Sequence, residues 1–220
     1  MSTFRIPILF IAISLASLGN VFAQALDISS GGAPTITGSS GGSVTGSASV
    51  LNNLVVTVNF GELSPLNTNN IVKVTVPIGV RSNQPYRVTV TYSGSTNANV
   101  QAIQKTDIGF GVRNMRAMGS NSRVCNYSNH LFYSPFSNDP TTLVTLNAAG
   151  RAQYLSDLAD VTTATTILTG PRLSNGGGSR ATNDGYIFDA ILAITPQFYA
   201  AGTTSATLTF TISAGPVVPC

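Results

Sequence analysis

Apolar and hydroxyl-bearing residues alternate one by one along several stretches of this chain, and this pattern restricts the fold more than any other feature. In residues 205–212, Ala, Leu, Phe and Ile alternate with Ser and Thr. Side chains of a strand point alternately to opposite faces, so a period of two predicts a strand with one buried and one polar face. The same pattern predicts further strands at residues 44–50, 54–60, 71–80, 86–92, 108–112, 143–146, 166–169 and 186–194.

Turn-forming residues separate these stretches, as at Asn183-Asp184-Gly185. Short strands with Thr-rich outer faces predict an all-β chain, an antiparallel β-sandwich of immunoglobulin-like or pilin-like topology with at most one short helix. That helix is expected within residues 148–160, where Ala152, Leu155 and Leu158 fall on one side and Asn147 provides a cap.

The composition agrees with a sheet protein and excludes several classes. Charged residues make up 9% of the chain, against roughly 25% in typical soluble domains. The exposed faces of helical bundles need such charges, and this chain has few. The net charge of +3 comes from a small excess of Arg without a concentrated basic face, so we expect no nucleic-acid partner.

The first 25 residues are typical of a secretory signal peptide. Arg5 precedes an apolar run from Ile6 to Leu18, and small residues follow at Ala23 and Ala25. The run is too short to span a bilayer, and no later apolar run is long enough to do so. We therefore expect a protein that is secreted, extracellular or held at the cell surface, with the periplasm as a further location.

Residues 26–50 are rich in Gly and Ser and are expected to form an N-terminal arm that precedes a single sandwich domain at 51–220. Val44, Gly46, Ala48 and Val50 share one face of an extended chain. Such a small-residue strand on a tether suits addition to the sheet of a neighbouring copy. The alternative is that it is the first strand of its own domain.

Cys125 and Cys220 are the two cysteines of the chain. In an exported protein their default state is one disulfide. It would close a loop of about 100 residues and stabilise the fold by roughly 4 to 5 kcal/mol in the chain-entropy description. Two free thiols, or an intermolecular bridge through the terminal Cys220, are the alternatives.

Catalytic groups are scarce. His130 is the one histidine, and a Ser-His-Asp triad would need it beside a nucleophile and an acid. The Gly-x-Ser-x-Gly match at 38–42 lies in a Gly/Ser stretch without the strand and helix that a nucleophile elbow requires. One histidine and two cysteines that are expected to be bridged cannot supply a zinc tetrad without several carboxylates. We expect no cofactor, no metal and no enzymatic activity, with a secreted hydrolase that uses His130 as the least favoured reading.

The segment from residue 125 to 136 is rich in aromatic residues. Aromatic rings beside Asn and Arg suit stacking on sugars or contact with a partner protein. The alternative is that these rings cover an open end of the sandwich. The candidate ligand-binding residues are Arg123, Tyr127, His130, Phe132, Tyr133 and Phe136.

The C-terminal run Ile194-Thr195-Pro196-Gln197-Phe198-Tyr199-Ala200-Ala201-Gly202-Thr203-Thr204, followed by the strand to Ile212, resembles the closing hairpin of secreted bacterial pilin-like and spore-coat-type β-sandwich proteins. It departs from them at Thr204, where an aromatic is common, and by continuing to Cys220. The resemblance implies a surface or filament subunit.

Together these features favour an exported, non-enzymatic structural or adhesive subunit, self-assembling by strand addition. Its expected partners are copies of itself or other surface proteins. The alternative is a secreted carbohydrate- or ligand-binding module that uses residues 125–136, with polysaccharide as the partner.

Overall fold

The computed structural model of this chain describes residues 26–50, 52–66, 70–94, 99–118, 129–173, 185–202 and 204–219. Within these ranges the chain forms strands and one 3-10 turn, η1. This part of the chain has no helix that is long and apolar enough to cross a membrane. The predicted signal peptide lies outside the described residues.

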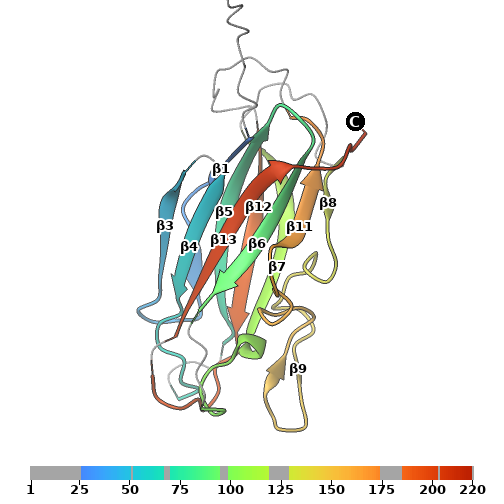
Figure 1. The fold of residues 1–220 in the computed structure, drawn as a ribbon. Helices are drawn as coiled ribbons and strands as arrows, with labels where there is room; N and C mark the ends of the chain where they lie inside the picture. Colours follow the sequence, from blue (N-terminus) through green and yellow to red (C-terminus); the bar gives the residue numbers. More distant parts are fainter. Residues whose placement is uncertain are drawn as a thin grey trace, which may run out of the picture.

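The strands follow one another along the chain as Figure 1 shows. Their bounds are β1 Leu26–Ser30, β2 Thr35–Thr37, β3 Ser43–Val50, β4 Asn53–Asn59, β5 Val72–Ser82, β6 Tyr86–Ser93, β7 Ile108–Met118, β8 Leu131–Phe132, β9 Thr145–Leu146, β10 Ala152–Gln153, β11 Thr165–Gly170, β12 Gly185–Ile194 and β13 Ser205–Ala214, with η1 at Lys105–Asp107. The longer predicted strands correspond to β4, β5, β6, β12 and β13, which confirms the period-two reading.

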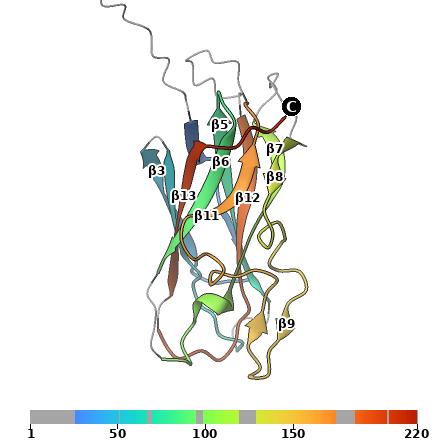
Figure 2. The ribbon, with the colours of Figure 1, turned by 45° about the vertical axis from the view of Figure 1, so that its right-hand side comes forward.

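Two antiparallel sheets face each other (Figures 1 and 2). The first has the order β1-β5-β12-β7, with β2 also paired to β5, and the second has the order β3-β4-β13-β6-β11-β8. The short strands β9 and β10 pair only with each other. The prediction of an all-β antiparallel sandwich is confirmed.

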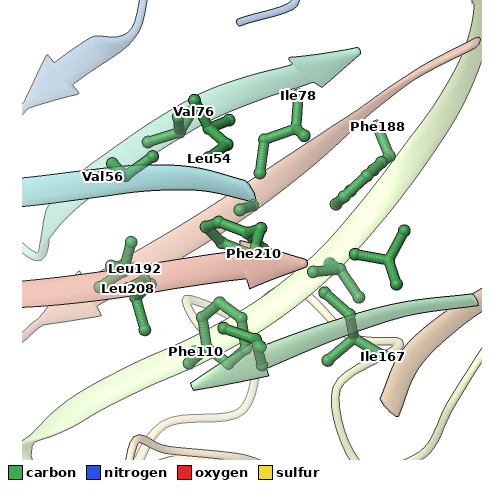
Figure 3. Close-up of a cluster of buried hydrophobic side chains, with 14 of the residues drawn as sticks. Leu54, Val56, Val76, Ile78, Phe110, Ile167, Phe188, Leu192, Leu208 and Phe210 are labelled. Atoms are coloured by element: carbon green, nitrogen blue, oxygen red, sulfur yellow. The ribbon is translucent and has the colours of Figure 1, made fainter. Parts of the chain in front are cut away.

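The core lies between the sheets and consists of alternate residues from each strand. Phe188 and Leu192 of β12 face Leu208 and Phe210 of β13, and all four are fully buried (Figure 3). Fully burying one such side chain contributes about 1.5–3 kcal/mol. This core explains why the apolar positions of the alternating stretches are Val, Ile, Leu and Phe.

The outer face of the first sheet is also covered. Ile191 and Ala193 of β12 point away from the core cluster and are nevertheless buried. The covering comes from the segment between β8 and β11, because a Cβ on Gly109 would lie 2.6 Å from the Tyr154 ring and 2.8 Å from Pro140. Burial on both faces explains why β12 is a nearly continuous apolar run.

The helix expected within residues 148–160 is wrong. The chain there forms the β9–β10 hairpin and turns. The Asn147 side chain accepts hydrogen bonds from the backbone N–H groups of Ala149 and Arg151, both at 2.9 Å, and Gly150 has a φ of 74°. A side chain that binds nearby backbone groups and a left-handed glycine favour a turn over a helix.

The expected N-terminal arm is part of the sandwich. Of residues 26–50, β1 and β2 pair with β5 of the first sheet, and β3 pairs with β4 of the second. Glycine permits the close approach that this path requires, since a Cβ on Gly31 would lie 2.9 Å from Ile187. The small-residue strand therefore folds onto its own domain, as the alternative interpretation had it.

Candidate functional site

Two rings of the aromatic segment pack in the core or against it. Phe136 is 2% exposed and its ring centre is 5.6 Å from that of Phe110. Phe132 is half-buried and packs edge-on against Phe188 at 6.2 Å. These two rings pack against the sandwich, and the burial of Phe136 agrees with the tendency of large aromatic residues on which the alternative interpretation rested.

The other members of the segment are placed only in part. His130 lies between two tyrosine rings, with centroid distances of 5.9 Å to Tyr86 and 4.8 Å to Tyr186. Tyr133 is half-buried, and its backbone N–H donates to the carbonyl of Ile167. Arg123 and Tyr127 lie outside the described residues, so ligand binding by them stays a prediction.

His130 sits among packed rings. Burial, together with the neighbouring Tyr186, raises the pKa of Tyr86 well above its ordinary value. Asp139, an acid close to His130 in the sequence, instead accepts hydrogen bonds from Lys73 at 2.6 Å and from the Thr141 hydroxyl at 2.6 Å. These contacts give Asp139 a structural role.

Cys125 and Cys220 lie outside the described residues, whereas Asn129 and Pro219 lie within them. The Asn129 side chain donates a hydrogen bond to the carbonyl of Pro219 at 3.2 Å. Pro219 directly precedes Cys220, and Asn129 follows Cys125 by a few positions. This contact is favourable to the predicted pairing, which stays a prediction.

Most charges on the first sheet are paired. Arg81 binds Asp27 at 3.0 Å and Arg116 binds Asp189 at 2.8 Å. Burial acts to raise the pKa of Asp139, but hydrogen bonds from Lys73 and Thr141 outweigh it and lower that pKa. These carboxylates hold strands and loops together.

The edges of the two sheets differ in how they are protected. Part of β7 is covered, because the N–H groups of Phe110 and Val112 donate to the carbonyls of Ser156 and Phe136. Its remainder carries Arg113 and Arg116 beside a bulge. At the other edges, β8 has two residues, while β1 and β2 are short and are separated by a segment containing Pro34. Short strands, charges, bulges and proline are the usual protections of a sheet edge.

The edge at β3 lacks these protections over its first five residues. Ser43 to Ser47 pair in unbroken register with β4 and contain no charged residue and no proline, before a bulge beyond Ser47. Val44 is half-buried against the core, and Gly46 is exposed. The side chains of Ala48 and Val50 lie outside the description.

The hydrogen-bonding direction of β3 follows from its neighbours. Ile212 donates to the carbonyl of Asn52, so alternate residues of β4 from Asn52 onward bind β13. The intervening residues of β4 bind Ser43, Thr45 and Ser47, because hydrogen-bonded and non-bonded pairs alternate in an antiparallel ladder. The backbone N–H and C=O groups of Val44 and Gly46 therefore point outward from the edge.

A second candidate site lies at the end of the sandwich formed by residues 60–66, 99–107, 143–158 and 195–202, here called the tip loops. An ion pair joins two of them. Arg151 donates to both carboxylate oxygens of Asp107, at 3.0 and 2.5 Å, and Asp107 is 2% exposed. Arg151 also donates to the carbonyls of Val100 and Ala102. Hydrogen bonding to Asp107 raises the pKa of Arg151.

Amide and phenol groups fix the remaining tip loop. Gln197 donates to the carbonyl of Gly150 at 2.7 Å, and the Tyr154 hydroxyl accepts from the N–H of Thr195 at 2.7 Å. Tyr199 lies under the Arg151 guanidinium at 5.2 Å. Burial raises the pKa of both tyrosines, so they are neutral hydrogen-bonding groups at ordinary pH.

Sequence reasoning did not identify the tip loops. Asp107 and Arg151 are 44 residues apart, and neither stands in a local motif. The pair Phe198-Tyr199, two aromatic residues between Pro196 and Gly202, was a usable signal, since aromatic residues in a turn-rich loop are unusual unless they pack or bind.

Known proteins offer no guide to either candidate site: no protein family, no curated protein and no solved structure matches this chain.

Proposed function

We propose that this protein is an exported, non-enzymatic structural subunit that pairs with a second copy of itself along β3. The observation that carries the proposal is the contrast between β3 and the other described edges. Edges without charge, proline or cover are templates for pairing with another chain.

Pairing of two β3 strands around a two-fold axis would extend both second sheets into one. In the antiparallel arrangement the outward groups of Val44 face those of Gly46 in the partner, which gives about four new backbone hydrogen bonds. At about 1 kcal/mol each they contribute roughly 4 kcal/mol. Dimers at about 1 mM need a net free energy of about −4 kcal/mol, so burial of apolar surface beside the paired strands must offset the cost of association. The association is therefore weak and suits a protein concentrated at a surface.

The test is a charge placed on this edge. A Cβ at Gly46 meets no atom within 4 Å, so Gly46→Lys adds an ammonium group without a clash. Gly202→Lys is the matched control, since Gly202 has the same open surroundings and lies in the loop before β13, outside β3. Small-angle scattering of the purified protein, up to about 1 mM, should show dimers for the wild type and the control and monomers for Gly46→Lys.

A wild type that stays monomeric over this range refutes the proposal. So does a Gly46→Lys variant that dimerises like the wild type. Unchanged far-UV circular dichroism of both variants verifies that the comparison concerns the edge and not the fold.

A further inference from the structure

We infer that the tip loops bind a neutral polysaccharide chain in a groove that runs past Phe198. This inference is independent of the proposed pairing along β3, because it concerns another part of the molecule. The tip loops form the lower end of the sandwich in Figures 1 and 2. Both ends of the described chain lie at the opposite end, where Leu26 pairs with Ser82 and Gly215 donates to the carbonyl of Pro85.

The groove consists of adjoining hollows. One of about 610 Å³ and one of about 390 Å³ share Pro65, Gln197, Phe198 and Tyr199 as lining residues. A third, of about 640 Å³, adjoins the first at Arg151. A row of open hollows fits a chain-like ligand better than a single small molecule, which favours one enclosed pocket.

The tip loops present a concentration of exposed apolar side chains, part of which lines the groove. Of the eight large hydrophobic residues that are exposed in the described part of the chain, six lie on the tip loops. Phe198, Val100 and Leu66 are 77%, 72% and 81% exposed, and Phe198 and Val100 line the same hollow. Exposed apolar groups gathered at one place mark an interaction site, and an aromatic face beside them suits the C–H face of a sugar ring.

The carboxylates of Glu62 and Asp157 line the groove, and its other polar groups are neutral or already paired. The guanidinium of Arg151 donates to Asp107 and to two backbone carbonyls, so it offers no strong attraction to an anion. The exposed side chain of Gln101, in the same hollow, supplies an amide donor and acceptor. These groups suit the hydroxyls of an uncharged sugar polymer.

The charges around the groove disfavour an anionic lipid surface. Glu62, Asp107 and Asp157 lie on the tip loops, where the cations are Lys105 and Arg151. An excess of carboxylates repels anionic headgroups. The fixed geometry of the loops, held by the Arg151 and Gln197 hydrogen bonds, also lowers the ordering cost of binding a chain.

The experiment measures retention of the purified protein on particles of cellulose, chitin and β-1,3-glucan. We expect retention on at least one of them. For Phe198→Ala we expect a dissociation constant at least tenfold larger, which is a loss of about 1.4 kcal/mol in binding free energy. Leu131→Ala, which removes an exposed leucine from β8 outside the tip, is the matched control and should bind like the wild type. Phe198 is 77% exposed, so its removal leaves the core intact.

Three results would overturn the inference. They are no retention of the wild type on any of the three particles, retention that Phe198→Ala leaves unchanged, and binding to phosphatidylcholine vesicles in place of the particles. Binding to a neutral polymer should also be insensitive to salt between about 50 and 500 mM, and a marked loss across that range would indicate a charged ligand instead. The Gly46→Lys variant should bind the particles as the wild type does, which separates this test from that of β3.

Discussion

The ion pair between Arg151 and Asp107 gives the sharpest prediction about stability. Asp107 is 2% exposed and accepts two hydrogen bonds from Arg151 and one from the N–H of Gln104. Arg151→Ala leaves this buried carboxylate without its cation and removes the donors to the carbonyls of Val100 and Ala102.

The expected loss follows from these contacts. Removing one partner of a buried ion pair costs about 3–5 kcal/mol. The Arg151 side chain is 24% exposed, so water partly replaces it and the lower end, about 3 kcal/mol, is the expected value. For a chain of this size that corresponds to a fall of roughly 6–12 °C in the melting temperature.

The assay is urea unfolding followed by circular dichroism, for the wild type, Arg151→Ala, Asp107→Asn and the double variant. The double variant should be more stable than the sum of the two single losses implies. Arg151→Ala leaves the buried Asp107 carboxylate without its cation, whereas the double variant has no carboxylate at this position. Arg113→Ala is the control, since Arg113 is an exposed arginine that lies 3.8 Å from its nearest carboxylate oxygen, and it should cost less than about 1 kcal/mol. A loss below 1 kcal/mol for Arg151→Ala, or strict additivity in the cycle, would refute the reasoning.

Two further predictions concern pH and the cysteines. The pKa of Asp139 is lowered in the folded protein. The ionised carboxylate therefore stabilises the fold above the unfolded pKa of about 4, and this stabilisation is lost as the pH falls through the folded pKa. The difference in unfolding free energy between the wild type and Asp139→Asn should narrow below about pH 4, and a difference that widens on acidification would contradict this. Peptide mapping without reduction should recover Cys125 linked to Cys220, and Cys220→Ser should cost up to about 5 kcal/mol; alkylation of both thiols in the native protein would disprove the pairing.

Strands whose two faces differ in environment were predictable, and strands without such a contrast were harder. In β13, Leu208 and Phe210 face the core while Thr207 and Thr209 alternate with them. The sequence pattern therefore indicates which residues of this strand point into the core. The Gly/Ser content of residues 26–50 indicated an arm, but some of those glycines serve close packing: a Cβ on Gly31 would meet Ile187 across the sheet. The composition of a segment does not show which distant residues will pack against it.

The helix within residues 148–160 failed for a similar reason. The spacing of its apolar residues was compatible with a helix, but Asn147 binds the following backbone and Gly150 adopts a left-handed conformation. Arg151 then reaches Asp107, a contact that no periodic pattern encodes. The tip loops were therefore beyond sequence reasoning, except for the aromatic pair that begins at Phe198.

The direction of β3 relative to the tip loops decides what a pair of these molecules can do. Strands joined antiparallel place the lower end of one copy at the upper end of the other, so a β3-linked pair carries its two grooves at opposite poles. Such a pair has two binding grooves, which face in opposite directions along the strand axis. One pair of molecules would then tie two separate glycan chains together, as a cross-link in a matrix does, without either chain competing for the same groove.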